Sequence, residues 1–320
     1  MLVLLVMAVT GAVAQKTYKV SVKEGTEDAT SWQGKAGTGD YQELPLEGVA
    51  AGTAVTVKYS GTKKVKSVKA KKKAAAGNTV DLSTLTANYE AQDGDVLTGS
   101  TSTYSVTIAD DATVTLDGVT INGVNNDSYS WAGITCLGDA TIILSGTNTV
   151  KGFYDEFPGI YVPENKTVTI DGSGSLTASS NGYGCGIGGG YEIACGNIVI
   201  AGGTITATGG DFAAAGIGGG DTGSCGTISI TGGTITATGG ESAAGIGSGN
   251  SGSCGDITIT NGVTSVTATK GEGADYSIGA SNYGSCGTVT IGCTLDGGGN
   301  PVGGTTGQIS TSPYTYQPSN

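Results

Sequence analysis

The chain has 320 residues, 59 of them glycine, and a formal net charge of −12 at pH 7. Glycine is at more than twice its usual share of ~7 %, yet Val, Ile and Thr are abundant and only 6 residues are proline, which excludes collagen and a disordered tail. The chain contains no Arg and no His. Because phosphate contacts require cations, nucleic acid is not an expected partner of this acidic protein.

Residues 1–14 predict a signal for export. An apolar run at residues 2–9 leads to small residues at 11–14, the pattern that a signal peptidase reads. We expect cleavage after Ala14, so that the mature protein is secreted, held at the cell surface or periplasmic. No later apolar stretch is long enough to predict a transmembrane segment.

Residues 15–73 predict a small β module. Polar and apolar residues alternate at 18–22, 54–59 and 65–68, with turn residues between them. Residues 16–73 carry 12 lysines against 6 acidic residues, whereas residues 74–320 carry 3 lysines against 21. We interpret the lysine-rich strands as solvated faces over a small core. Residues 74–98 are expected to form a linker and the cap of the next domain.

Internal repeats predict the fold of residues 99–303. The block at 195–210 recurs at 225–240 and, more loosely, at 254–270. Each copy contains an alternating apolar pair, a second stretch such as 205–207, and a third that starts with Gly-Ile. Three short strands in each copy predict a right-handed parallel β-helix of about seven three-strand coils, because parallel crossovers are almost always right-handed. The pairs recur at steps of 26 to 32 residues and are Val114/Leu116, Ile142/Leu144, Val168/Ile170, Ile198/Ile200, Ile228/Ile230, Ile257/Ile259 and Val289/Ile291.

Residues 304–320 are expected to be a polar C-terminal tail. The last coil, near Val302, would then be uncapped. An open strand edge offers unpaired backbone groups to another chain, so such an end would invite end-to-end association, although the sequence leaves the oligomeric state open.

Three stretches carry a resemblance to known proteins: GIYVP at 159–163, TVTIDGSG at 167–174 and AGIGGG at 215–220. With these, the chain resembles exported glycine-rich β-helix proteins of anaerobic gut bacteria, some of which are labelled carbohydrate-binding domain proteins. The likeness covers residues 80–300, and the segments 24–29 and 61–69 are similar to small β repeats that precede such helices. The resemblance implies the parallel β-helix and the binding of a glycan, but it transfers no binding residue.

The loops before the Gly-Ile strands carry aromatic residues beside acidic ones, and stacking of the coils would align them in one column. Aromatic rings pack on the C–H faces of sugars, and carboxylates accept hydrogen bonds from sugar hydroxyls. The alternative is that the aromatic side chains fill the loop cores, above all Trp131 and Phe157. The candidate residues for binding a polysaccharide or a cell-surface glycan are Tyr129, Trp131, Phe153, Tyr154, Asp155, Glu156, Phe157 and Tyr183.

A catalytic site is not expected. Lyases of this fold use an Arg or Lys base beside calcium, and the matching hydrolases resemble an Asp cluster supported by His and Arg, two residue types that this chain lacks. One alternative is a polysaccharide lyase or glycoside hydrolase that acts through carboxylates alone, with Asp155 and Glu156 as the nearest pair. Another alternative is a structural spacer on the cell surface.

No cofactor is expected, although calcium is an alternative. Ca²⁺ prefers several oxygen ligands from loops, but the acidic residues of the loop column match no calcium motif, and solvated charge is the simpler interpretation. These residues are Asp127, Asp155, Glu156, Asp211, Glu241, Glu272 and Asp275.

Two further residue types recur in register. Cysteines begin four copies, at 195, 225, 254 and 286; a ladder of buried thiols is favoured over disulfides, because side chains in register point the same way. Threonines alternate with apolar residues at 204–208 and 234–238, which suits the outer face of a strand. Similar arrays occur in ice-binding solenoids, and such a face could equally meet a flat polymer.

Overall fold

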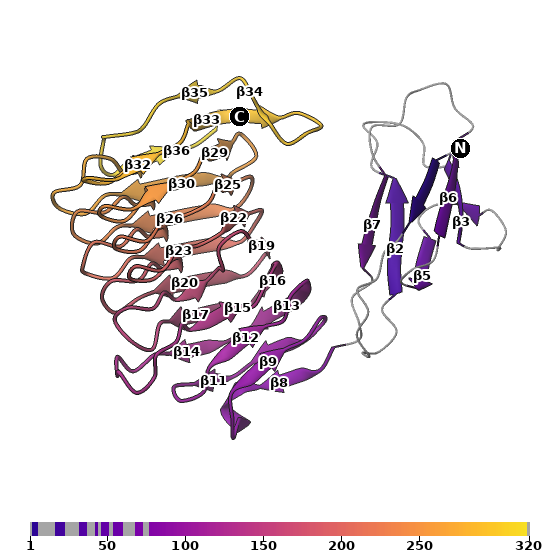
Figure 1. Cartoon of the computed structure of the whole chain (residues 1–320), viewed down its shortest axis with the longest axis horizontal. Helices are drawn as coiled ribbons and strands as arrows, with labels where there is room; N and C mark the ends of the chain where they lie inside the picture. Colours follow the sequence, from indigo (N-terminus) through magenta and orange to yellow (C-terminus); the bar gives the residue numbers. More distant parts are fainter. Residues whose placement is uncertain are drawn as a thin grey trace. The chain divides into compact units, whose positions relative to one another are not determined.

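The computed structural model describes residues 77–318 and, between residues 1 and 76, the backbone of seven strands. The chain divides into two compact units, Met1–Ala75 and Ala76–Asn320 (Figure 1). The described part is almost entirely β-structure, and it contains no helix long and apolar enough to cross a membrane.

The first unit contains two antiparallel sheets, in the orders β1-β6-β3-β4 and β5-β2-β7. β2 and β6 coincide with predicted strands, and β7 begins where the third predicted strand ends. β1 lies within the segment for which the sequence predicts an export signal, and that signal stays a prediction. The bounds are β1 Leu2–Leu5, β2 Thr17–Val22, β3 Trp32–Ala36, β4 Gln42–Glu43, β5 Leu46–Ala50, β6 Ala54–Tyr59 and β7 Val68–Lys72.

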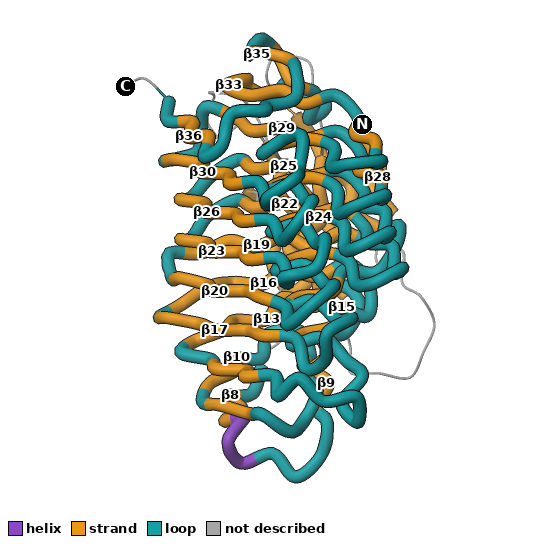
Figure 2. Tube along the Cα trace, turned by 90° about the vertical axis from the view of Figure 1, so that its left-hand side faces the viewer, coloured by secondary structure: helices purple, strands orange, loops and turns teal. Residues whose placement is uncertain are grey.

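The second unit is a parallel β-helix, in which each strand pairs with its counterpart in the next coil (Figures 1 and 2). Its three sheets are called face 1, face 2 and face 3, in their order along a coil. Within the described residues, seven coils, from β10-β11-β12 to β29-β30-β31, contribute a strand to every face. The predicted series of apolar pairs is offset by one coil, because it begins at Val114 in β13 and ends in β33. Face 1 comprises β8 Thr79–Asp81, β10 Val96–Thr98, β13 Ala112–Asp117, β16 Ala140–Ser145, β19 Thr167–Gly172, β22 Asn197–Ile200, β25 Ile228–Ile230, β29 Ile257–Thr260 and β33 Val289–Leu295.

Faces 2 and 3 complete each coil. Face 2 comprises β11 Ser100–Thr101, β14 Thr120–Asn122, β17 Thr147–Lys151, β20 Ser175–Ser179, β23 Thr204–Thr208, β26 Thr234–Thr238 and β30 Ser265–Thr269. Face 3 comprises β9 Tyr89–Ala91, β12 Val106–Ile108, β15 Ile134–Cys136, β18 Ile160–Tyr161, β21 Ile187–Gly188, β24 Ile217–Gly218, β27 Ile246–Gly247 and β31 Ile278–Gly279. The shorter pair β28 Ser253–Cys254 and β32 Ser285–Cys286 lies at the corner between face 3 and face 1.

The core consists of apolar side chains stacked coil on coil. On face 1 the fully buried Ile200, Ile230 and Ile259 stand in one column, and alternation along each strand places the intervening side chains outward. One part of the predicted register is wrong. The predicted pairs align Val114 and Ile142 with Val168. In the structure Val114 and Ile142 align with Ile170, which lies two residues further along the chain.

The N-terminal boundary differs from the prediction. Residues 74–98 were expected to precede the helix as linker and cap, but β8 and β10 already pair on face 1 and β9 begins face 3. A one-turn 3-10 helix, η2 (Leu82–Thr84), buries Leu82 against the first coil. The buried carboxylate of Asp95 accepts hydrogen bonds from the backbone N–H groups of Asn78 and Gln92 and from the Tyr89 hydroxyl, which fixes this end.

The C-terminal segment is a cap and not a free polar tail, which corrects the prediction. β34 (Pro301–Val302) and β35 (Thr305–Thr306) pair antiparallel with β33, and β36 (Tyr314–Tyr316) pairs antiparallel with β30. Between them Ile309 forms a backbone bridge with Ile278 and packs against the core. The last coil is therefore covered on all three faces, and the expected open end near Val302 is absent from the described structure.

Candidate functional site

The loops between face 2 and face 3 hold the aromatic residues that the sequence places in one column, and the structure separates them into two groups. Tyr129, Trp131 and Phe153 pack on one another, with ring centroids 5.3 to 6.0 Å apart. Phe153 has an exposed fraction of 0 %. It belongs to the core, so its assignment as a ligand contact is corrected, because the inward turn of the loop leaves no ring surface to solvent. Tyr129 and Trp131 remain half-buried beside it.

This packing makes a testable prediction about stability. Phe153→Ala should lower the free energy of unfolding by about 3–5 kcal/mol, because it removes a buried aromatic ring and leaves a cavity. The matched control is Phe212→Ala, the same change at a side chain that is 50 % exposed, where a loss of about 1 kcal/mol is expected. Denaturant unfolding monitored by circular dichroism measures both, and equal losses would contradict the assignment of Phe153 to the core.

The loop between β17 and β18 holds part of the candidate site in place through its backbone carbonyl groups. The carbonyl oxygen of Asp155 accepts from the backbone N–H of Tyr183 (2.6 Å), and that of Glu156 accepts from the N–H of Tyr191 (2.8 Å). Tyr154 and Phe157 are half-buried, and the Glu156 side chain is exposed. This loop therefore anchors two tyrosines from different corners of the helix in one place.

Those tyrosines and Phe212 form the second aromatic group, here called the aromatic row. The rings of Phe212 and Tyr183 are stacked, with centroids 5.1 Å apart and an interplanar angle of 26°. Tyr183 and Tyr191 have centroids 5.1 Å apart at 57°. Phe212 is half exposed and both tyrosines are partly exposed, so the row presents ring surface to solvent. Of the candidate binding residues only Tyr183 belongs to it, and Phe212 is an aromatic residue of the same predicted loop column, whereas Tyr191 was not predicted.

Two carboxylates lie beside the aromatic row. Glu192 accepts a hydrogen bond from the Tyr191 hydroxyl, which raises the pKa of that tyrosine. Asp221 donates its backbone N–H to the carbonyl oxygen of Tyr183 (3.1 Å), and its carbonyl oxygen accepts from the N–H of Glu192 (2.9 Å). Burial raises the pKa of Asp221, whose Oδ1 atom has no hydrogen-bond partner among the described residues. Tyr191, Glu192 and Asp221 all lie in loops that follow face 3, which the sequence analysis did not single out.

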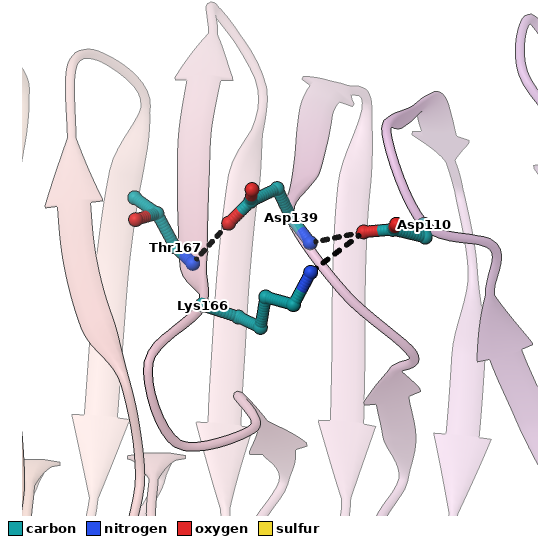
Figure 3. A network of polar contacts seen from close by, with 4 residues as sticks. All are labelled: Asp110, Asp139, Lys166 and Thr167. Atoms are coloured by element: carbon teal, nitrogen blue, oxygen red, sulfur yellow. Dashed lines mark hydrogen bonds and ion pairs between the residues drawn. The ribbon is translucent and has the colours of Figure 1, made fainter. Parts of the chain in front are cut away.

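A separate group of carboxylates lies where face 3 turns into face 1 (Figure 3). Asp110 Oδ1 accepts from the backbone N–H of Asp139 (2.9 Å) and lies 3.4 Å from Lys166 Nζ, while Asp139 Oδ1 accepts from the N–H of Thr167 (2.7 Å). With Asp111, their carboxylate oxygens lie within 4.8 Å of one another, beside an open hollow. Asp110 and Asp139 each accept a hydrogen bond from a backbone N–H of the following coil. Both carboxylates therefore have a structural role.

These three residues differ from the set that the sequence offered for calcium. The predicted acidic column lies in the loops between face 2 and face 3, and the carboxylates that the structure gathers most closely lie at another corner. All three are exposed. For the predicted acidic column, calcium stays the alternative to solvated charge that the sequence leaves open.

Face 2 presents the threonine array that the sequence predicts. On β23, Thr204, Thr206 and Thr208 are exposed while Ile205 and Ala207 are buried. The strands of face 2 are stacked one on another (Figure 2). The neighbouring strands continue the pattern in register, so hydroxyls and methyls form parallel columns along the outer side of the sheet. The central column contains Thr120, Thr149, Thr177, Thr206, Thr236 and Thr267.

The predicted thiol ladder is present in the structure. Cys225 bridges to Cys254 in parallel register, and Cys254 lies directly opposite Cys286 with their Sγ atoms 3.3 Å apart. Cys195 and Cys225 are buried in the same column, and pairing by disulfide bonds is absent among the described cysteines. Burial raises the pKa of the more distant Cys136 thiol to about 12, as expected for a small apolar core residue.

Comparison with known proteins agrees with the fold. A family model described as a beta helix repeat matches residues 168–191, 198–221 and 228–250. Each match runs from a face 1 strand to just beyond the following face 3 strand, so it spans one coil. No match is found among curated proteins or among solved structures. The chain is a parallel β-helix protein; since one fold hosts many functions, its function has to be argued from its own side chains.

Proposed function

We propose that this protein is an exported, non-catalytic scaffold that binds a polysaccharide or a cell-surface glycan through the aromatic row. The observation that carries the proposal is the row itself: three adjacent rings, Phe212, Tyr183 and Tyr191, with surface open to solvent. Rings of this kind pack on the C–H faces of sugars, and a rigid row suits a chain with several sugar units. Export rests on the predicted signal at residues 1–14.

The polar groups beside the row support the same ligand class. Sugar hydroxyls need hydrogen-bond acceptors next to the ring that the sugar covers, and Glu192 and Asp221 supply carboxylates there. The anchoring of Tyr183 and Tyr191 by the backbone of residues 155–156 holds the rings before any ligand arrives, which reduces the entropy lost on binding.

The alternatives differ in what they require. A carboxylate-based glycoside hydrolase needs two carboxyl groups about 5 to 10 Å apart on either side of the sugar bond. Of the closest carboxylates, Asp110 and Asp139 already hold backbone amides of the next coil. A pure spacer needs no exposed aromatic row at all. The row therefore favours binding over the spacer. Because Glu192 and Asp221 also lie beside the row, the product assay below decides between binding and hydrolysis.

The test measures binding of the full chain to plant, microbial and mucin polysaccharides, with reducing ends and unsaturated products monitored in the same wells. Phe212→Ala and Tyr191→Ala are each expected to weaken binding about tenfold, which corresponds to about 1.4 kcal/mol for one lost ring contact. Tyr283→Ala is the matched control, because Tyr283 is 92 % exposed and lies outside the row.

Each outcome separates the candidate functions. Binding that is lost in the row variants and kept in the Tyr283 control supports the proposal. Sugar products in the wells would establish an enzyme instead, and binding that survives both row variants would move the site elsewhere on the helix. No binding to any polymer would favour the spacer.

A further inference from the structure

The last two coils bring two cysteines into direct opposition at the corner between face 3 and face 1. β28 and β32 pair in parallel with Cys254 opposite Cys286, and the two Sγ atoms lie 3.3 Å apart. Neighbouring strands are about 4.8 Å apart, within the Cα separation of about 4.4–6.8 Å that a disulfide tolerates. Side chains in register point the same way, which disfavours disulfides along the ladder as a whole. In this pair the Sγ atoms already lie 3.3 Å apart, so an S–S bond of about 2.05 Å requires rotation of the two side chains and not a change in backbone spacing.

Solvent access distinguishes this pair from the rest of the ladder. Cys195, Cys225 and Cys254 are buried, whereas Cys286 is half-buried and can meet a reagent from solution. The two thiols are in hydrogen-bond contact, and either can be the donor. This contact lowers the pKa of Cys286, while the same contact and burial raise the pKa of Cys254. Thiolates are the nucleophiles in disulfide exchange, and of the two only Cys286 is open to solvent, so Cys286 meets the reagent first and Cys254 attacks second.

We propose that Cys254 and Cys286 form a disulfide by exchange with a small-molecule disulfide. The Cys286 thiolate attacks one sulfur of the reagent; a mixed disulfide forms as the reagent S–S bond breaks, and the released thiolate takes up a proton. Cys254 then gives its proton to water and attacks Cys286 Sγ, which expels the second small thiol. The two protein thiols are oxidised by two electrons, and the reagent is reduced to two thiols.

The bond would connect the coil that carries the C-terminal cap to the coil before it. Cys254 and Cys286 are 32 residues apart, so the cross-link closes a loop of one coil. A cross-link of this kind restricts the unfolded chain, and we expect the midpoint of thermal unfolding to rise by several degrees on oxidation.

The positions of the lysines allow a direct test on the full chain. In residues 77–320 trypsin can cleave after Lys151, Lys166 and Lys270, so Cys254 falls in the peptide 167–270 and Cys286 in the peptide 271–320. Cys293→Ser leaves Cys286 as the sole cysteine of the second peptide. After incubation of this variant with oxidised glutathione, the non-reduced digest should contain the two peptides joined, lighter by two hydrogen atoms than their sum.

Further variants identify the partner. Cys254→Ser in the same background should abolish the joined peptides, and Cys225→Ser should retain them. Circular dichroism checks that the serine variants keep the β-helix, and the rise in the unfolding midpoint on oxidation provides a second measurement that needs no digestion. Peptides that stay separate, with Cys286 alkylated or carrying glutathione, would overturn the proposal, as would a disulfide formed wholly within 167–270.

Discussion

Gly218→Ala is expected to abolish the continuous β-helix, with a loss of more than about 4 kcal/mol in the free energy of unfolding. Gly218 closes β24 on face 3 with a φ of +132°, a conformation that side chains rarely adopt. A methyl group there would also overlap the carbonyl oxygen of Gly247 in the next coil, well inside the 3.0 Å that real Cβ atoms keep. That carbonyl accepts a hydrogen bond from Gly219, so it cannot move away without further loss.

The same geometry recurs along face 3. Gly188 and Gly247 also have φ values near +140°, and a Cβ on either would meet the backbone of the following coil. The column needs glycine because the coils approach closely there, and each turn contacts only its neighbours. A single substitution should therefore divide the helix at that coil, and not merely loosen one loop.

Gly118→Ala is the matched control. Gly118 also has a positive φ, +71°, but an added Cβ would find nothing within 4 Å. It should cost only backbone strain, about 1 kcal/mol. Soluble yield and thermal unfolding by circular dichroism compare the two variants. If Gly218→Ala unfolds like Gly118→Ala, the close approach of the coils on face 3 is not as the structure has it.

The architecture of the second unit could be predicted because each coil repeats its own pattern. Gly-Ile marks the start of the third strand in five of the seven coils, at β15, β18, β21, β24 and β27, and alternation assigns the outward threonines. The register of the first coils was missed for a physical reason. Ala112 and Ala140 occupy inward positions where later coils have Val168 or Ile198, and a shift of two residues leaves every side chain on the same face.

The candidate site was predicted only in part, since a sequence does not show which loops meet. Tyr183 was found by its place before a Gly-Ile strand, but Tyr191 follows such a strand and reaches the row from another corner. A usable signal was present: Tyr191 stands where the next two copies have Asp221 and Asn250. An aromatic ring at a polar position of a repeat indicates a local role. Phe153 was wrongly predicted to contact a ligand. Its burial depends on the path of the loop, and the alternation of polar and apolar residues along the strands does not predict that path.

The C-terminal cap could not be recognised from composition. Ile309, Tyr314 and Tyr316 are its apolar residues, and they are dispersed among Gly, Ser, Thr and Pro. Their spacing matches no strand of the repeat, because they pair antiparallel with the last coil. The segment therefore looks polar in sequence while it covers an apolar end in the structure.

Deletion of residues 304–320 is expected to cause association of the protein through the exposed last coil. The segment supplies acceptors at the ends of face 2 and face 3. The Ile309 carbonyl oxygen accepts from the Ser277 N–H (2.7 Å), Gln308 Oε1 from the Ala280 N–H (2.6 Å) and Ser312 Oγ from the Lys270 N–H (3.1 Å). Without them an open strand edge and apolar core would face solvent, and such edges pair with other chains.

Size-exclusion chromatography with light scattering compares the molar mass of the protein without residues 304–320 with that of the full chain over a range of concentrations. Removal of residues 317–320 alone is the control, because β36 stays paired with β30 and the size distribution should not change. Ile309→Asp tests the cap without shortening the chain; a charge at this packed position should also favour association and lower the unfolding midpoint. If the protein without residues 304–320 has the same association state and stability as the full chain, the segment does not close the helix. The prediction from the sequence that the last coil is open would then be correct.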